Sequence, residues 1–469
     1  PAVSERSTPE RARTVTAAET LAGRAIALQQ RLAETQWLAP AEIAAMQARA
    51  ITPLLEHAWR TVPAQRARLE AVGYRPGAPL STEAWRALAP QSRREMQLDP
   101  VAWASTAPPP EHGEIVRAAS SGSTGTPLAV LGTVHDALIA KAFTLRAMLW
   151  HDIDLEATLA IIRKHADGQA EWPEGDRAAR WGDEATYPFP TGPSVSLDVK
   201  VPTDRQLEWL ARTGARYLLA YPSILRAYGS AHGEPRLALD RVITVSEALG
   251  DDDRAITREV LGAEIIDAYS AREAGPIALQ CPDAPAGTAH YHVQAERIVV
   301  EIVDDAGAPV APGEAGRVLL TGLHNYAQPL IRYDIGDIAV QGPPSCGCGR
   351  GLPVVSRIKG RVRNMLIGPG GARFWPSFMT SGLIGRLPLL QHQFIQRSVA
   401  SVVDGREVPA RLECHLVVAR PLTGEEEELI RSRLESRLHG PWSIEFRYRD
   451  SIARAPSGKY EDCFVALED

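Results

Sequence analysis

The chain has 469 residues, of which 45% are hydrophobic and 23% are charged, and its formal net charge is −6 at pH 7. This length exceeds one ordinary hydrophobic core, so we expect two or three domains with the composition of a soluble globular protein. The small negative charge, without a long run of one sign, argues against nucleic acid or an anionic membrane as the main partner. A small molecule is the expected partner, and a homodimer is left open.

No apolar stretch of the sequence is long enough to cross a bilayer, and the polar segment 1–19 has no apolar signal region. We therefore expect a cytoplasmic protein. The five cysteines are too few and too scattered for a disulfide framework, but they leave a metal site open.

In chain order, residues 17–103 show apolar residues at helical spacing, and Ser81 offers a helix start. We expect a helical lobe there. Segment 137–150 is typical of a buried helix and segment 157–162 of a buried strand. Segment 166–197 is rich in Gly, Pro, Trp and Asp without clear periodicity, which favours either a substrate-facing wall or a mobile surface insertion.

Strands and helices alternate in the middle of the chain. This spacing predicts a parallel sheet with helices on its faces. Ligands of such sheets bind beyond the carboxyl ends of the strands, which places Glu247 and the stretch after Tyr269 at one crevice. The expected helices are 203–213, 223–230 and 253–261, and the expected strands are 217–220, 241–245 and 264–269.

From residue 297 to residue 340 the pattern becomes antiparallel and predicts a small β barrel or sheet. Its expected strands are 298–302, 316–321 and 328–333. Beyond a boundary near 360–363, strands 393–397, 411–418 and 442–448 and a charged helix 424–438 predict a compact α+β unit.

The fold class is therefore α/β. We expect a large N-terminal domain with a helical lobe, mixed and mostly parallel sheets and a small β barrel, followed by a small α+β domain. The expected divisions are a helical lobe (1–110), an α/β core with a β subdomain (111–361), and a C-terminal α+β cap (362–469).

The loop 120–127, with the sequence SSGSTGTP, holds only hydroxyls, glycines and one proline between apolar flanks. Such a loop forms a nest of backbone N–H groups that suits phosphate oxygens, and a plain Ser/Gly-rich surface loop is the alternative. It lacks the lysine of a Walker loop, which disfavours a P-loop NTPase.

Four more segments follow this loop: DAYSARE at 267–273, LIRYDIGD at 330–337, IKGRVRNMLI at 358–367 and APSGK at 455–459. In this order and spacing, the five segments resemble those of the adenylate-forming superfamily, and most closely its phenylacetate-CoA ligase branch. The resemblance runs from about Leu38 to the C-terminus. It implies an enzyme that activates a carboxylic acid with ATP as an acyl-adenylate. It also implies that the core 111–361 binds ATP and the acid and holds a zinc site, and that the cap 362–469 is mobile.

The resemblance also implies a role for single residues. The loop would hold the β- and γ-phosphates, and Glu273 with Thr124 would hold Mg²⁺. Tyr269 would stack on adenine, and Asp337 would bind the ribose hydroxyls. The expected site residues are Lys459, Glu273 and Arg361 as catalytic residues, Ser120, Ser121, Gly122, Ser123, Thr124, Gly125, Glu247, Tyr269 and Asp337 as cofactor-binding residues, and Arg363 in the hinge.

Lys459 would place its charge between the carboxylate and the α-phosphate and leave when the cap rotates, while Arg361 would reach ribose or phosphate. Each role has a plain structural alternative. Glu273 suits a solvated helix start, Asp337 a turn, and Tyr269 a strand-end core aromatic.

A second set of residues is a candidate metal site. Three thiols and one imidazole form a closed tetrahedral zinc set, which contributes folding energy rather than a reactive water. Reduced structural cysteines are the alternative, and His290 competes with His292. Part of the phenylacetate-CoA ligase branch carries a similar set. The expected zinc ligands are Cys281, His292, Cys346 and Cys348, and the expected cofactors are ATP, Mg²⁺, structural Zn²⁺ and CoA.

Several positions depart from the family pattern. Arg363-Asn364 stand where the hinge usually carries acidic residues, Ser270 replaces a glycine, and Arg272 adds a cation beside Glu273. Arg163-Lys164-His165 replace the glycine-rich segment that lines the acyl pocket.

These departures leave the acid and the acceptor open. An acid-CoA ligase for an aromatic or arylacetic-like acid is the leading hypothesis. The alternatives are an adenylate-forming enzyme of small-molecule biosynthesis that passes the acyl group to an amine, a carrier protein or another nucleophile, and a nucleotide-binding protein that has lost turnover.

Overall fold

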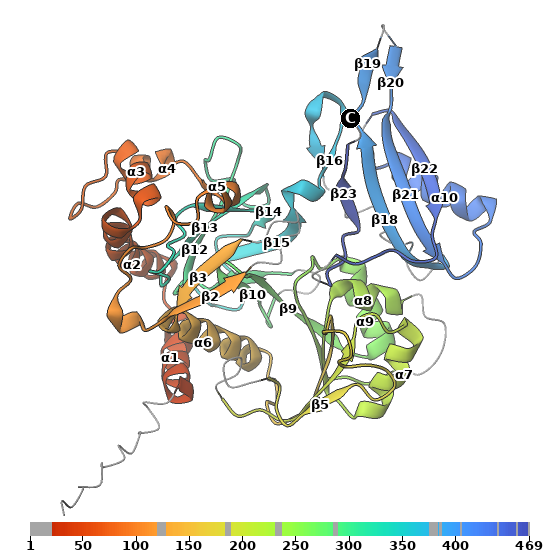
Figure 1. Cartoon of the computed structure of the whole chain (residues 1–469), viewed down its shortest axis with the longest axis horizontal. Coiled ribbons are helices and arrows are strands. Elements are labelled where there is room, and N and C mark those ends of the chain that lie inside the picture. The colour runs from red at the N-terminus through yellow and green to blue at the C-terminus, as the bar shows by residue number, and fades with distance from the viewer. Residues whose placement is uncertain are drawn as a thin grey trace, which may run out of the picture.

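The computed structural model describes residues 21–119, 128–182, 189–229, 237–284, 289–374, 383, 387–403, 406–438, 440–455 and 458–467. Figure 1 shows a large body and a smaller cap, which contains β18 (Leu389–Ser398), β21 (Ala410–Val418), β22 (Trp442–Tyr448) and α10 (Gly424–Glu435) and lies above helices α8 (Pro222–Tyr228) and α9 (Asp251–Leu261). None of the described helices combines the length and the apolar character that a membrane span needs.

The helical lobe forms as expected. Prolines at the first position of α2 and α3 suit helix starts, because a first-turn N–H has no partner within the helix. The predicted start at Ser81 is confirmed, since its side chain accepts the Ala84 N–H at 3.2 Å. The described helices of the lobe are α1 (Leu21–Thr35), α2 (Pro40–Thr61), α3 (Pro63–Ala71), α4 (Thr82–Ala87) and α5 (Arg93–Leu98), and a 3-10 turn spans Pro110–His112.

One half of the main sheet is parallel and confirms the predicted alternation of strands and helices. Its strands, in sheet order, are β9 (Glu264–Ala271), β8 (Arg241–Thr244), β7 (Tyr217–Ala220), β4 (Leu159–Arg163) and β6 (Ser194–Asp198), with β5 (Asp176–Ala178) antiparallel at the edge. The helices are α6 (Val134–Trp150), α7 (Thr203–Thr213), α8 (Pro222–Tyr228) and α9 (Asp251–Leu261). The short strands are largely buried, as expected for a sheet covered on both faces.

The antiparallel strands, which we expected to form a small β barrel or sheet, form no separate barrel but continue the same sheet through β9 and β10. They are β10 (Gly275–Gln280), β11 (Tyr291–Val293), β15 (Val354–Arg361), β14 (Tyr333–Gln341), β13 (Ala315–Gly322) and β12 (Ile298–Val303), and β1 (Gln91–Ser92) pairs with β14. A separate pair, β2 (Ile115–Ala119) and β3 (Ala129–Thr133), flanks the loop 120–127.

Two expectations for strands were wrong. The expected strand 328–333 begins only at Tyr333, because Arg332 has φ 47° and its guanidinium donates to the carbonyls of Arg86 and Leu88, both at 2.8 Å. The segment 166–197, expected to be irregular, contains β5 and most of the buried strand β6. Its functional interpretation stays a prediction.

The cap has its own hydrophobic core, which contains Leu412, Leu416, Ile430 and Leu434. Its main sheet has the order β22-β21-β18-β23, with α10 packed against it. The predicted strands and charged helix are confirmed, and the predicted start of the cap at Val362 stays a prediction. The elements are β16 (Leu366–Ile367), β17 (Arg373–Phe374), β18 (Leu389–Ser398), β19 (Ser401–Val403), β20 (Arg406–Val408), β21 (Ala410–Val418), α10 (Gly424–Glu435), β22 (Trp442–Tyr448) and β23 (Cys463–Val465), with 3-10 turns at Val362–Asn364 and Pro369–Gly371.

Candidate active site

Four expected site residues meet around β9, β14 and β15. Tyr269 lies on β9, and Glu273 lies in the turn that joins β9 to β10. Asp337 on β14 is the register partner of Arg361 on β15. The Tyr269 hydroxyl donates to Asp337 Oδ2 at 2.7 Å, and Arg361 Nε lies 3.5 Å from Asp337 Oδ1. The sheet therefore brings together segments far apart in the chain.

Asp337 is a buried carboxyl group with cationic and hydroxyl partners. Burial raises its pKa, while the Arg361 guanidinium and the Tyr269 hydroxyl favour the ionised form. Each carboxylate oxygen has two lone pairs, so the group can still accept hydrogen bonds from the hydroxyls of a ligand.

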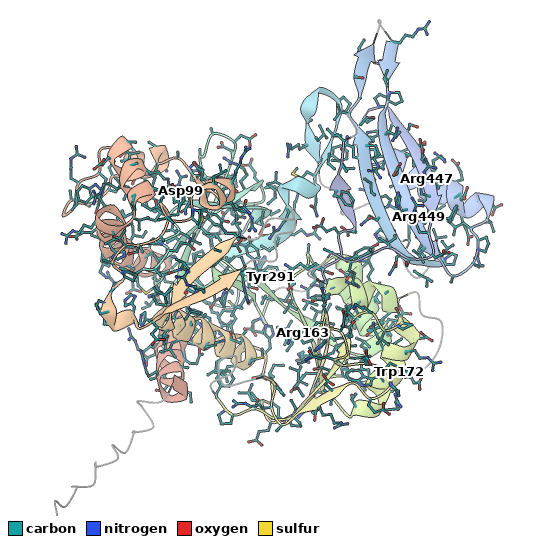
Figure 2. All side chains as sticks on the ribbon, viewed as in Figure 1. Asp99, Arg163, Trp172, Tyr291, Arg447 and Arg449 are labelled. Carbon is teal, nitrogen blue, oxygen red and sulfur yellow. The ribbon has the colours of Figure 1, made fainter. Side chains whose placement is uncertain are left out.

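Asp267, the first residue of the 267–273 motif, is bound by the scaffold. Its carboxylate accepts the Thr244 hydroxyl and the Tyr291 hydroxyl, each at 2.6 Å, and Tyr291 lies in the interior of the large body (Figure 2). These bonds connect β9 with its neighbour β8 and with β11, which lies beyond β10 in the sheet. Asp267 therefore helps to position the strand that carries Tyr269.

Glu273 has a partner that the sequence analysis missed. Arg93 Nη1 lies 2.5 Å from Glu273 Oε1, and the Glu273 side chain is only 5% exposed. The pairing of Ser92 with Asp334, between β1 and β14, brings the start of α5 to this place. Nothing in the sequence distinguishes Arg93 from the other arginines, because its partner lies 180 residues away.

Lys459 reaches this cluster from the cap. It interacts electrostatically with the carboxyl groups of Asp337 and Glu273, and also with that of Glu247. Burial, followed by repulsion from Arg361, lowers the pKa of the Lys459 ammonium. The one described lysine of the cap therefore faces carboxylates of the large body.

The Lys459 loop is a tight turn that requires a glycine. The Ala455 N–H donates to the Lys459 carbonyl at 2.9 Å, and Gly458 has φ 82°. A Cβ atom on Gly458 would lie 2.5 Å from Lys164 Cβ and 3.3 Å from the Tyr221 hydroxyl. Only glycine combines this conformation with such close contact between cap and large body.

Glu247 lies at the seam between the two bodies. Its Oε2 accepts the Ser223 N–H at 2.9 Å, and its Oε1 accepts the Tyr460 N–H of the cap at 2.6 Å. Burial raises the pKa of Glu247, whereas Arg454 and the two N–H donors favour its ionised form. The expected nucleotide-binding role of Glu247 stays a prediction.

Some expected residues cannot be placed. Ser120 to Gly125, with Thr124 among them, lie outside the described residues, as does the side chain of Arg363. Leu128, which directly follows the loop 120–127, is buried in the same core cluster as Tyr269 and Tyr333. The residue that follows the loop is therefore buried in the part of the large body that carries the cluster around Asp337.

The four metal candidates come together in the large body. Cys281 follows β10, His292 lies on β11, and Cys346 and Cys348 lie between β14 and β15. Their ligand atoms all lie within 4.8 Å of one another, which suits four ligands around one zinc ion. The Nδ1 atom of His292 lies 3.2 Å from the Leu352 carbonyl, the usual support of a zinc-bound imidazole. Of the two candidate histidines, His292 belongs to the cluster and His290 does not.

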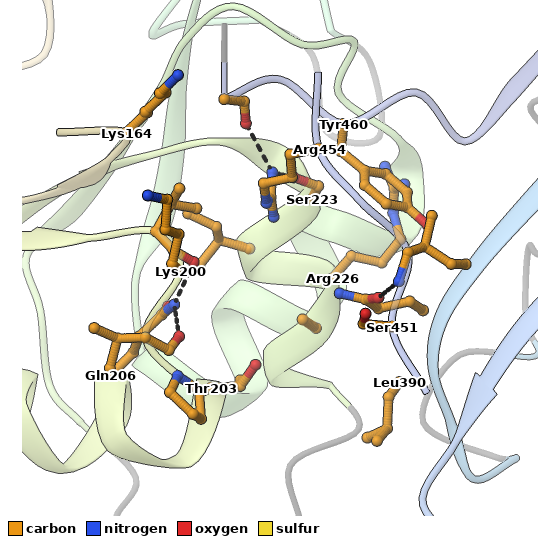
Figure 3. A pocket seen from close by; sticks show the side chains of 18 of the residues that line it. Lys164, Lys200, Thr203, Gln206, Ser223, Arg226, Leu390, Ser451, Arg454 and Tyr460 are labelled. Carbon is orange, nitrogen blue, oxygen red and sulfur yellow. Dashed lines mark hydrogen bonds between the residues drawn. The ribbon is translucent and has the colours of Figure 1, made fainter. Parts of the chain in front are cut away.

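A pocket of about 530 Å³ lies along the seam (Figure 3). The large body contributes Lys164, Lys200 and Ser223 to its wall, and the cap contributes Arg454 and Tyr460. Because both bodies form the wall, the pocket depends on this orientation of the cap.

Comparison with known proteins agrees with this geometry. No family model matches the chain. The phenylacetate-coenzyme A ligase of Escherichia coli is 25% identical over 390 residues, which cover 79% of this chain and 83% of that protein. The phenylacetate-coenzyme A ligase of Thermus thermophilus is 27% identical over 175 residues, which cover 37% of this chain and 38% of that protein.

The fold is also that of a solved ligase. The structure of 2-hydroxyisobutyryl-CoA ligase in the postadenylation state, in complex with 2-HIB-AMP, has a TM-score of 0.64 and 18% sequence identity, and the match covers 91% of this chain and 90% of that chain. The chain is therefore similar in sequence to phenylacetate-CoA ligases, and over most of its length it has the fold of the solved 2-hydroxyisobutyryl-CoA ligase.

Proposed function

We propose that this protein activates a carboxylic acid with ATP as an acyl-adenylate, releases pyrophosphate, and transfers the acyl group to the thiol of CoA. One observation carries the proposal: Tyr269, Asp337 and Arg361 meet in the large body, and the Tyr460 N–H beside Lys459 of the cap donates to Glu247 of the large body at 2.6 Å. An arylacetic or related aromatic acid is the proposed substrate, since the relatives are named for phenylacetate.

In the first half-reaction, a carboxylate oxygen attacks the α-phosphorus of ATP, and the bond to pyrophosphate breaks. Two anions must approach each other, so positioning and charge neutralisation supply most of the catalysis. We assign the ammonium of Lys459 to the space between the carboxylate and the α-phosphate. Asp337 accepts the ribose hydroxyls, and Tyr269 lies beside adenine. A Mg²⁺ ion held by Glu273 and Thr124 would neutralise phosphate charge.

In the second half-reaction, the CoA thiol attacks the acyl carbonyl and AMP leaves. Lys459 is no longer needed and moves away with the cap. We propose that the cap begins at Val362 and pivots at Arg363. The separate core of the cap supports this division, because a body with its own core can rotate without unfolding. The cluster of Cys281, His292, Cys346 and Cys348 holds a structural zinc ion outside this chemistry.

The test is ATP–pyrophosphate exchange over a panel of carboxylic acids that includes phenylacetate and 2-hydroxyisobutyrate. We expect exchange with at least one arylacetic acid, a matching acyl-AMP in the mass spectrum, and an acyl-CoA when CoA is added. Acyl-AMP without acyl-CoA would move the acceptor to an amine or a carrier protein. Binding of ATP without exchange for any acid would refute the enzymatic proposal.

A further inference from the structure

Glu247 connects the large body to the backbone next to Lys459. The Glu247 side chain is 8% exposed, and its Oε1 accepts the N–H of Tyr460, the residue that directly follows Lys459. We propose that Glu247 is a positioning residue that seats the Lys459 loop for adenylation, rather than a ligand of the nucleotide. This inference rests on the proposed function and specifies how the site is assembled.

The two oxygens of Glu247 serve different bodies. Oε2 accepts the Ser223 N–H of the large body at 2.9 Å, whereas Oε1 accepts the Tyr460 N–H of the cap at 2.6 Å. An ionised carboxylate that accepts backbone N–H groups in a buried place makes strong, directional hydrogen bonds. The position of the Lys459 backbone is therefore defined relative to strand β8, which Glu247 follows.

Arg454 supports the other side of the loop. Its Nη1 donates to the Ser223 hydroxyl at 2.9 Å and to the Gly458 carbonyl at 3.2 Å, and it lies 3.5 Å from Glu247 Oε1 (Figure 3). Gly458 and Tyr460 flank Lys459 in the sequence. Both neighbours of the lysine are thus held by groups that contact Ser223 or Glu247 of the large body.

These contacts exist only in this orientation of the cap. When the cap rotates, Tyr460 and Arg454 leave, and Glu247 keeps only its bond to Ser223. A group that interacts with one orientation alone shifts the equilibrium toward it by its differential interaction. Glu247 should therefore promote the adenylation half-reaction and contribute little to thioester formation.

The first test uses chemical labelling and needs no substrate. The chain has only five lysines, so limited acetylation followed by mass spectrometry reports on each of them. Lys459 is largely buried at the seam, whereas the Lys200 side chain is 64% exposed and serves as the internal reference. We expect Glu247→Gln to raise the acetylation of Lys459 relative to Lys200 about threefold or more.

The second test separates the half-reactions. Glutamine has nearly the same size as glutamate, but its NH₂ group cannot accept a hydrogen bond from one of the two backbone N–H groups. It also lacks the negative charge that attracts Arg454. Glu247→Gln should slow exchange about tenfold or more and leave thioester formation from synthetic acyl-AMP within about twofold, with an unchanged KM for ATP. Arg454→Gln should show the same pattern more weakly. Glu264→Gln, at an exposed ion pair remote from the seam, is the matched control.

Three outcomes would overturn the inference: unchanged labelling of Lys459, a raised KM for ATP with unchanged kcat, or equal losses in both half-reactions. Thermal unfolding of both variants identifies a folding defect, and Arg454→Gln decides the case if Glu247→Gln is unstable. A wild-type protein that shows protected Lys459 but no exchange would refute the proposed function and leave the seating of the lysine supported.

Discussion

Lys459 lies in an environment that lowers the pKa of its ammonium group. Because burial and Arg361 lower its pKa below the usual 10.5, the ammonium loses its proton at a lower pH than an exposed lysine. The charged form exists below the pKa. Adenylation should therefore decline as the pH rises through this lowered pKa, and the alkaline limb of the exchange rate should move to higher pH in Lys459→Arg.

Replacement of the side chain tests the same charge directly. Lys459→Ala should slow exchange by roughly 10²-fold or more, because a point charge on the transition state is lost, and leave the Kd for ATP nearly unchanged. The Kd can be measured by calorimetry. Lys141→Ala, a lysine on α6 outside the cluster around Asp337, is the control, and undiminished exchange in Lys459→Ala would contradict the assigned role.

Arg93 forms an ion pair with Glu273, the carboxylate that we propose as a ligand of Mg²⁺. A cation at 2.5 Å from Glu273 competes with the metal for the same oxygens. Arg93→Gln should therefore lower the Mg²⁺ concentration that gives half-maximal exchange by about twofold to tenfold. Arg94→Gln, at the exposed neighbouring position, should behave as wild type. A higher Mg²⁺ requirement in Arg93→Gln would show that Arg93 assists the metal instead of competing with it.

At the scale of elements, the cluster of Cys281, His292, Cys346 and Cys348 joins the strands β10 and β11 to the turn before β15. A zinc ion there would hold three segments together, since binding of a structural metal contributes directly to folding. Purified protein should contain about one equivalent of zinc per chain.

Removal of one ligand tests this cluster. Cys348→Ser should lower the zinc content measured by elemental analysis and reduce the thermal midpoint by about 5 °C or more, as should a strong chelator. Cys414→Ala, in the core of the cap, should retain zinc whatever its effect on stability. Full loss of zinc in Cys414→Ala, or none in Cys348→Ser, would place the metal elsewhere.

At the scale of the whole molecule, ion pairs hold the cap against the large body. Arg226 on α8 lies 3.1 Å from Asp462 of the cap and 2.9 Å from Asp253 of its own body. Asp462→Asn removes only the contact across the seam. Since the Asp462 side chain is 47% exposed, we expect a modest effect of about 0.5–1 kcal/mol, or twofold to fivefold slower adenylation.

Salt distinguishes this contact from a catalytic one. The difference in adenylation rate between Asp462→Asn and wild type should shrink as ionic strength rises, because salt screens the exposed ion pair between Arg226 and Asp462. Thioester formation should be unchanged or faster, since the cap leaves this orientation more readily. Asp240→Asn, which removes an exposed partner of Arg216 within the large body, is the control. A loss that persists at high salt would indicate a different role for Asp462.

Most of the elements of this protein could be predicted from the sequence. Helix 203–213 and strands 217–220 and 442–448 match the structure residue for residue, because apolar periodicity and turn residues mark their ends. The residues Tyr269, Glu273, Asp337, Arg361 and Lys459 could be selected because they belong to motifs in a recognisable order. The four candidate zinc ligands could be selected because the chain has few cysteines to choose from.

Other features were decided by tertiary structure. Arg93 became the partner of Glu273 only because β1 pairs with β14, and Glu247 accepts the Tyr460 N–H only because the cap lies against the large body. Strand β6 was missed because it lies in a segment without clear periodicity, and its pairing with β4 and its packing against α7 are not visible locally. The sequence by itself determined the class of fold and the chemical groups, since local periodicity and side-chain chemistry are properties of the chain. Which of these groups meet was settled by long-range pairing, which no local pattern encodes.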